Sequence, residues 1–255
     1  VVCVHNHDQV GNRALGDRSA CYLSEPAQRL ACGLLLVSPC VPLLFMGEEY
    51  GEQHPFPFFC SFEDTALIEA VRRGRREEFA ELEFEWGDQI PDPQASATFH
   101  SARLSWQWPE GTFHADLRRL YSDLLAARRT WPGLIDRTQT KTQILRFGQD
   151  SSDSDSSSAV LLAERGGMQG VVICANLTSQ RLPLSGSVTD FPEFSSRTLQ
   201  AVVTGLFSSE ERLSSGSCLL STEASRYGGS RDEKKPFEGL LPYELTVWSL
   251  KESRQ

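Results

Sequence analysis

Residues 1–13 form the run VVCVHNHDQVGNR, in which an apolar stretch meets a polar one at His5. A short apolar run that stops at such residues predicts a buried strand that opens into a loop. Residues 41–46, VPLLFM, form a second apolar run, closed by Gly47. Between the two runs, residues 27–37 are apolar without alternation, which favours a buried helix. The order strand, helix, strand predicts two strands of a parallel sheet, with polar residues after their carboxyl ends.

The pattern changes along the rest of the chain. Apolar residues at helical spacing predict helices over 64–79 and 113–129, with loops over 83–113. After residue 137 the apolar runs are short and separated by turn-rich segments, which is typical of an antiparallel β domain. Its predicted strands are residues 143–147, 159–163, 170–177, 198–203 and 245–250. The tract 150–158, almost entirely Ser and Asp, predicts a solvated insertion in a hairpin.

Domain size limits the possible folds. A (β/α)8 barrel requires about 250 residues, or roughly 30 for each βα unit. Residues 1–136 contain only two such strands with their helices, so we expect an α/β barrel end there, namely the last two βα units of a TIM barrel. An all-β antiparallel sandwich domain is expected over residues 137–255. Because the chain starts without Met and inside an apolar run, we also expect a fragment that lacks an N-terminal part.

The composition is that of a soluble globular protein. In 255 residues, 34 Asp and Glu exceed 25 Lys and Arg, which gives a formal net charge of −9. Such a molecule repels phosphate backbones and anionic lipids, so neither nucleic acid nor a membrane is an expected partner. Seven cysteines without a C-x-x-C pair favour reduced thiols and a cytoplasmic location. Motifs for phosphate loops, dinucleotide binding and serine nucleophiles are absent from the sequence.

The densest polar cluster runs from His5 to Arg13. On a strand, His5 and His7 would share one face, and Asn6 and Asp8 the other. Three interpretations are open. The first is a metal site of His5, His7 and Asp8, for which the remaining ligands are not apparent. The second is a structural role in capping a strand. The third is an active-site carboxylate beside groups that bond sugar hydroxyls.

Glu48 and Glu49 follow the second predicted strand. In a parallel barrel this position places them on the same rim as Asp8. Carboxylates accept hydrogen bonds from hydroxyls and aromatic faces cover sugar rings, so the rim suits a neutral polyol substrate. In the alternative interpretation, Glu48 or Glu49 bonds the backbone or an arginine such as Arg13. Four aromatic residues are either sugar platforms or packing groups, namely Trp86, Phe99, Trp106 and Trp108.

These stretches resemble the α-amylase superfamily of glycoside hydrolases. Residues 2–13, VCVHNHDQVGNR, resemble the region in which an N-H-D triplet closes barrel strand seven, and residues 34–52 resemble the helix and strand eight that follow. Further motifs are similar to one subfamily, the malto-oligosyltrehalose trehalohydrolases. They are residues 57–59 (PFF), 74–79 (GRREEF), 91–94 (PDPQ), 98–99 (TF) and 101–106 (SARLSW).

The resemblance implies a hydrolase that cuts the α-1,4-glucosidic bond next to the terminal trehalose of malto-oligosyltrehalose and releases trehalose. The retaining mechanism of the superfamily uses an Asp nucleophile, a Glu general acid/base and a second Asp that stabilises the oxocarbenium-like transition state. Asp8 matches that second Asp, and His7 matches an imidazole that bonds sugar hydroxyls. We assign substrate binding to His7, Asn6, Gln9 and Glu49, and we expect neither a metal nor a cofactor.

Two other functions are open. A glucan branching enzyme or another amylase-like hydrolase would share the N-H-D motif, and a non-catalytic glycan-binding relative would share the fold. The resemblance places the nucleophile and the general acid/base on strands four and five, which this sequence does not contain. We therefore expect residues 1–255 alone to hydrolyse no glucan.

Overall fold

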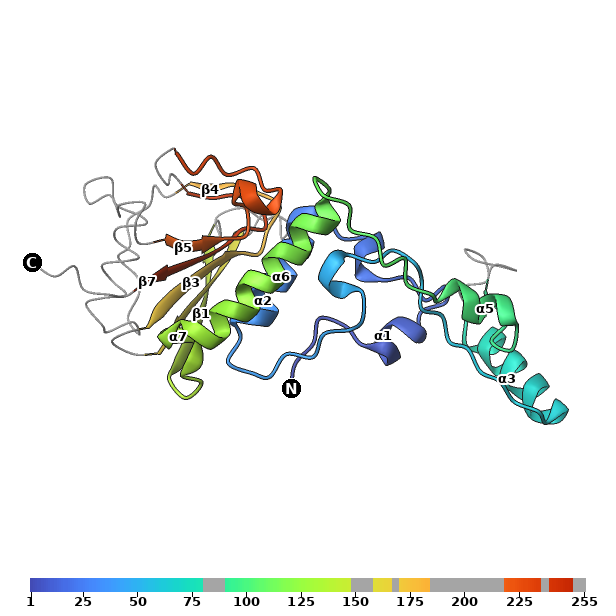
Figure 1. Cartoon of the computed structure of the whole chain (residues 1–255). Coiled ribbons are helices and arrows are strands. Elements are labelled where there is room, and N and C mark those ends of the chain that lie inside the picture. Colours follow the sequence, from blue (N-terminus) through green and yellow to red (C-terminus); the bar gives the residue numbers. More distant parts are fainter. Residues whose placement is uncertain (80–89, 148–157, 167–169, 184–217, 235–238, 250–255) are drawn as a thin grey trace, which may run out of the picture.

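The computed structural model describes residues 1–79, 90–147, 158–166, 170–183, 218–234 and 239–249. An antiparallel sheet lies at one end of the molecule, with helices α2 (Glu25–Val37) and α6 (Phe113–Thr130) against it (Figure 1). An arm extends from the other side of these helices and carries α1 (His7–Gly11), α3 (Thr65–Glu78) and α5 (Ser96–Ser101). The molecule is therefore elongated, and α2 and α6 lie between the sheet and the arm.

The three long helices predicted from the sequence are confirmed. Each begins after a capping residue, Ser24, Asp64 or Thr112, whose side chain accepts a hydrogen bond from the backbone N–H three residues on. The short helices α1 and α5 lie where loops were predicted, because five or six residues show too little periodicity to detect. The remaining helical turns are η1 (Ser19–Cys21), η2 (Glu48–Tyr50), α7 (Pro132–Ile135) and η6 (Ser225–Tyr227).

The two predicted strands of the parallel sheet are wrong in their extent. Val2 forms an isolated parallel bridge with Pro42, in which Val2 N donates to Val41 O at 2.9 Å and Leu43 N to Val2 O at 2.8 Å. The parallel order is therefore confirmed. The strands extend no further because Pro42 has no N–H to donate, and among the described residues no third strand flanks the pair. Val1 and Leu43 are exposed rather than buried, at 86% and 45%.

The sheet has the strand order β1-β2-β3-β7-β5, and all neighbouring strands are antiparallel. Its strands are β1 (Thr140–Phe147), β2 (Ser158–Arg165), β3 (Val171–Asn176), β5 (Cys218–Ser221) and β7 (Leu245–Ser249). The prediction of an antiparallel sheet is confirmed, although it missed β5. The predicted strand 198–203 and residues 150–157 of the Ser/Asp tract lie outside the described residues. A further pair joins β4 (Leu182–Pro183) to β6 (Gly239–Leu240), and the sandwich arrangement stays a prediction.

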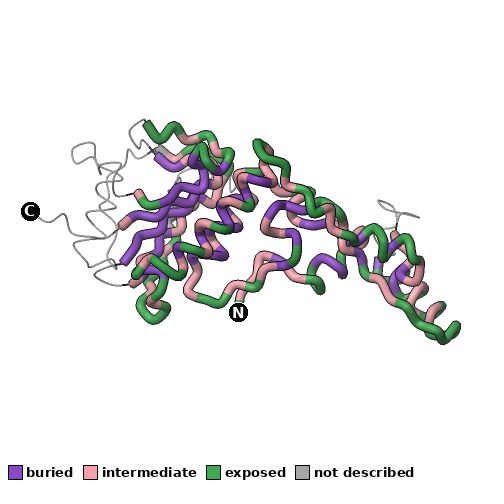
Figure 2. The backbone as a smooth tube through the Cα atoms, in the orientation of Figure 1, coloured by how far each residue is buried: buried purple, intermediate pink, exposed green. Residues whose placement is uncertain are grey.

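One hydrophobic core joins the helices to the sheet. Leu36 of α2, Leu124 of α6 and Ile173 of β3 belong to the same cluster and are at most 1% exposed. Figure 2 shows these buried segments side by side. Across the core, Arg29 of α2 donates to both carboxylate oxygens of Glu223, at 2.8 and 3.0 Å. The core thus draws on both predicted domains, and the boundary at residue 137 stays a prediction.

Two further features bear on the sequence predictions. All seven cysteines are unpaired, as predicted, with Cys32 and Cys174 buried but Cys21 and Cys40 exposed. Within the described ranges, none of the helices combines the length and the apolar character that passage through a bilayer requires.

Candidate functional site

The segment from Asn6 to Gln9 begins helix α1. The backbone of Asn6 is extended, and its side-chain Oδ1 caps the helix by accepting from Gln9 N at 3.0 Å. His7, Asp8 and Gln9 are exposed, and Nε2 of His7 lies 3.1 Å from Oδ1 of Asp8. Because the chain turns into a helix at this point, the predicted alternation of a strand is wrong here. His7 and Asp8 lie together on the outside of the molecule.

His5 points inward, away from that pair. It is 8% exposed, its Nδ1 lies 3.3 Å from Ser19 Oγ, and its ring packs edge-on against Phe45. Burial and the Arg18 cation lower the pKa of His5 to about 4, so the imidazole is neutral at neutral pH. The three side chains of the metal hypothesis therefore do not converge. Within the described ranges, no group of three or more potential ligands is arranged around a metal position.

Arg18 fastens the loop that carries the glutamates. Its guanidinium is 1% exposed and donates from Nε to His54 O and from Nη1 to Met46 O, each at 2.7 Å. It also lies over the ring of Phe45, 4.7 Å from the centroid. Residues 46 and 54 bracket Glu48, Glu49 and Glu52, so one side chain holds both ends of this loop. Arg18 was not among the candidate residues predicted from the sequence, because nothing in the motif distinguishes a buried arginine from a solvated one.

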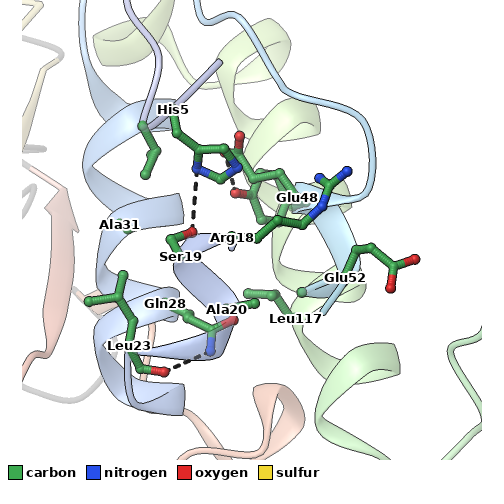
Figure 3. Close-up of a pocket in the computed structure, with 13 residues that line it drawn as sticks. His5, Arg18, Ser19, Ala20, Leu23, Gln28, Ala31, Glu48, Glu52 and Leu117 are labelled. Atoms are coloured by element: carbon green, nitrogen blue, oxygen red, sulfur yellow. Dashed lines mark hydrogen bonds between the residues drawn. The ribbon is translucent and has the colours of Figure 1, made fainter. Parts of the chain in front are cut away.

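His5 and Arg18 line a small cavity together with residues of this loop (Figure 3). Glu48, Glu52 and Tyr121 line it as well, and its space for the centres of water-sized molecules is about 20 Å³. Among the described residues, His5 Nε2 and Arg18 Nη2 have no hydrogen-bond partner. A volume of this size suits a bound water rather than a sugar. The cavity is thus a structural feature, and neither His7 nor Asp8 lines it.

The loop glutamates differ in their partners. Glu48 accepts from Tyr121 Oη at 2.7 Å and from Phe45 N at 3.2 Å, and burial raises its pKa. Glu52 is 3% exposed, and although burial opposes its ionisation, hydrogen bonds from the backbone of residues 54 and 105 and from two hydroxyls lower its pKa to about 2. Glu49 is half-buried, and its side chain forms no hydrogen bond with the described residues. The structural interpretation therefore holds for Glu48, while Arg13 pairs with Asp17 instead.

Two of the aromatic candidates, Trp106 and Trp108, lie beside this loop, next to the ring of Tyr50. Trp106 is 64% exposed and has a left-handed backbone with φ of 54°, and Phe99 is 49% exposed. Trp108 packs on the buried Tyr50 of η2, with ring centroids 5.1 Å apart. Trp86 lies outside the described residues. Trp108 is thus a packing group. Trp106 and Phe99 are exposed, but Phe99 also packs against Phe59 and has the Arg103 guanidinium over its ring, 6.0 Å from the centroid.

Similarity to a solved structure identifies the class of protein to which the chain is related. The chain superposes on the crystal structure of a candidate alpha amylase from Salmonella typhimurium with a TM-score of 0.66 and 26% sequence identity. The match covers 97% of this chain and 34% of that one. The predicted resemblance to the α-amylase superfamily is thereby confirmed.

The sequence relatives are more particular. The chain is similar to curated malto-oligosyltrehalose trehalohydrolases: 45% identical over 132 residues to that of Arthrobacter ramosus, 47% over 131 to that of Mycobacterium tuberculosis, and 38% over 190 to that of Brevibacterium helvolum. These matches cover 52%, 51% and 74% of this chain, but only 23%, 22% and 30% of the relatives. No family model matches. The predicted resemblance to this subfamily is confirmed, and the chain spans less than a third of each relative's length.

Proposed function

We propose that this chain is part of a glycoside hydrolase that cleaves the α-1,4-glucosidic bond next to the terminal trehalose of malto-oligosyltrehalose. The observation that carries the proposal is the exposed pair of His7 and Asp8, 3.1 Å apart at the start of α1. The pair follows directly on the segment that bridges Pro42 in parallel, which is where a parallel barrel places its chemistry. The similarity to trehalohydrolases supports the choice of substrate.

In the proposed mechanism Asp8 stabilises the oxocarbenium-like transition state of a retaining reaction. Its carboxylate is 74% exposed and lies beside an imidazole, so a sugar ring has free access to both groups. His7, Gln9 and Asn6 would bond sugar hydroxyls, together with Glu49, to which the structure assigns no other partner among the described residues. The nucleophile and the general acid/base are assigned to no residue of this chain.

Product analysis tests the substrate. The complete enzyme that contains this chain is given malto-oligosyltrehalose in one reaction and plain maltodextrin in another. Free trehalose as the main product of the first reaction, with slow turnover in the second, is the expected result. Transfer of glucan branches, or equal hydrolysis of both substrates, would favour a branching enzyme or another amylase-like hydrolase. Binding without turnover would favour a glycan-binding protein.

The same assignment predicts the behaviour of the isolated chain. Because two of the three catalytic carboxylates are assigned outside it, residues 1–255 alone are expected to hydrolyse no glucan. Release of trehalose by the purified chain would contradict the assignment.

We further propose that the protein acts in the cytoplasm, in trehalose formation. The seven unpaired cysteines support a reducing location. Alkylation of the protein from freshly lysed cells, denatured without a reductant so that the buried Cys32 and Cys174 can react, is expected to label all seven thiols of this chain, and fewer labels would contradict this location.

A further inference from the structure

Helix α3 meets the rest of the molecule in an unusual way. Of its 14 residues, the one that is buried is Arg75, at 9% exposure. Leu67, on the same helix, is 43% exposed. Figure 1 shows α3 at the far end of the arm, next to α5 and away from the sheet. The apolar Ile68 and Val71 are only half-buried, and polar groups share in the attachment of the helix, Arg72 by bonding Asp92 at 3.0 Å.

Arg75 reaches from α3 to the end of α1. Its Nη2 donates to Gly11 O at 3.1 Å and to Arg13 O at 3.5 Å. Its Nη1 donates to Glu78 at 2.7 Å, and the guanidinium lies over the rings of Phe79 and Phe58, 4.7 and 5.3 Å from their centroids. The guanidinium of Arg75 is thus held by Glu78 and by two aromatic rings, and its Nη2 donates to backbone carbonyls.

The carbonyl of Gly11 belongs to helix α1, which carries Asp8, and that of Arg13 lies two residues beyond the end of α1. A helix of five residues has little stability of its own, and the last carbonyls of any helix lack partners within it. A cation at this end supplies donors and interacts favourably with the helix dipole. Asp8 lies three residues before Gly11, and its carbonyl accepts from Asn12 N at 3.0 Å. A constraint at Gly11 is therefore transmitted to Asp8 through less than two helical turns.

We propose that Arg75 is a positioning residue: it fastens α3 to the carboxyl end of α1 and thereby fixes the orientation of His7 and Asp8. The fastening is a property of the chain itself. Its consequence for turnover rests on the function proposed above, with Asp8 acting on a glucan. In this arrangement α3 supports the site from behind and supplies no group that touches the substrate.

The first arm of the test measures amide hydrogen exchange in residues 1–255. In Arg75→Gln, the amides of Val10 and Asn12, which close α1, are expected to exchange about tenfold faster, because a charge-assisted hydrogen bond is lost. Core amides of α2 and α6 serve as the internal reference and should not change. The matched control is Arg73→Gln, whose side chain is 69% exposed and pairs loosely with Glu77 at 3.9 Å. Equal exchange in the two variants would overturn the proposal, as would global unfolding of a conservative Arg75→Lys variant.

The second arm measures kinetics of the complete enzyme that contains this chain, on whichever glucan it hydrolyses. Misorientation of a group that acts only in the transition state lowers kcat and leaves KM nearly unchanged. Arg75→Gln is expected to lose about tenfold in kcat with KM within about twofold, and Arg73→Gln should match the parent. Faster exchange with an unchanged kcat would overturn the positioning role. Absence of trehalose in the parent reaction would contradict the proposed substrate without affecting the exchange result.

Discussion

At the scale of single residues, the three glutamates of the loop between residues 46 and 54 occupy three different environments, although they lie within five positions of the sequence. Glu48 is bonded to Tyr121 and to the backbone, and Glu52 accepts from five donors. The oxygens of Glu52 have no capacity left to offer a ligand, and each oxygen of Glu48 is directed at a partner within the protein. Of the three, Glu49 is therefore the one that suits substrate binding, together with the exposed Asp8 on α1.

Asp8→Asn in the complete enzyme is expected to lower kcat by at least about a hundredfold while the protein folds normally. An amide still bonds hydroxyls, but it carries no negative charge to balance the charge that develops at the anomeric carbon. His7→Ala should cost less, because it removes hydrogen bonds and no charge. Steady-state kinetics provides the measurement.

Asp17→Asn is the matched control for this substitution, because Asp17 forms a partly exposed ion pair with Arg13. It should turn over like the parent, since surface pairs contribute little to stability. If Asp8→Asn retained parent turnover, Asp8 would have to be removed from the site.

The buried His5 predicts a pH dependence of stability. Its pKa is lowered from 6.5 to about 4 by folding, so between these values the unfolded chain binds more protons than the folded one. The contribution of His5 to the free energy of unfolding must then fall as the pH falls through this window, by about 2 kcal/mol between pH 7 and pH 5, whereas the raised pKa values of Glu48 and Glu223 contribute with the opposite sign. Urea unfolding of residues 1–255 at both pH values measures it.

His5→Phe removes the titrating group and should flatten this part of the pH profile. His100→Phe, at an exposed position, should leave the profile unchanged. Equal slopes for the parent and His5→Phe would show that His5 titrates normally. Glu52 does not interfere, because its lowered pKa affects stability only below about pH 4.5.

At the scale of elements, the sequence predicted those helices whose signals lie within the helical segment itself. The helices over 27–37, 64–79 and 113–129 were found because caps and apolar spacing lie within each segment. The extended pairing at residues 2 and 42 was overestimated, because an apolar run does not reveal how many neighbouring strands it will have. In the candidate site, the exposure of His7 and Asp8 and the inward turn of His5 depend on α1, which is too short to predict. Arg18 and Arg75 bond backbone carbonyls of distant segments, and no sequence pattern reports such contacts.

The ion pair between α2 and the segment after β5 predicts a large effect of a single substitution. Arg29 and Glu223 are each 2% exposed, and burial raises the pKa of Glu223 while the Arg29 cation opposes this. Arg29→Met leaves a buried carboxylate without its partner and should lower the free energy of unfolding by about 3 to 5 kcal/mol. The double variant Arg29→Met, Glu223→Gln should recover part of the loss. A double variant as unstable as the sum of both single variants would show that the two residues act independently.

At the scale of the whole molecule, the shared core predicts how the chain can be divided. Residues 137–255 contain the sheet, but α2 and α6 supply one side of its hydrophobic core. Expressed alone, this segment would expose the apolar residues of β3 and β7 that pack on those helices, and we expect it to lose cooperative unfolding. Residues 1–255 serve as the reference in thermal and urea melts. A cooperative transition of the short segment would establish residue 137 as a true domain boundary.

The order in which this core is assembled during synthesis follows from the same arrangement. Arg29 and Glu223 are 194 positions apart, so at roughly 5 to 20 residues per second the ribosome needs roughly 10 to 40 seconds to supply the second after the first. For most of that interval α2 has been synthesised while β3, β5 and β7, which contribute to the same core, have not. The apolar face of the nascent helix is then available to chaperones or to neighbouring chains, and the yield of folded protein should depend on the rate of translation.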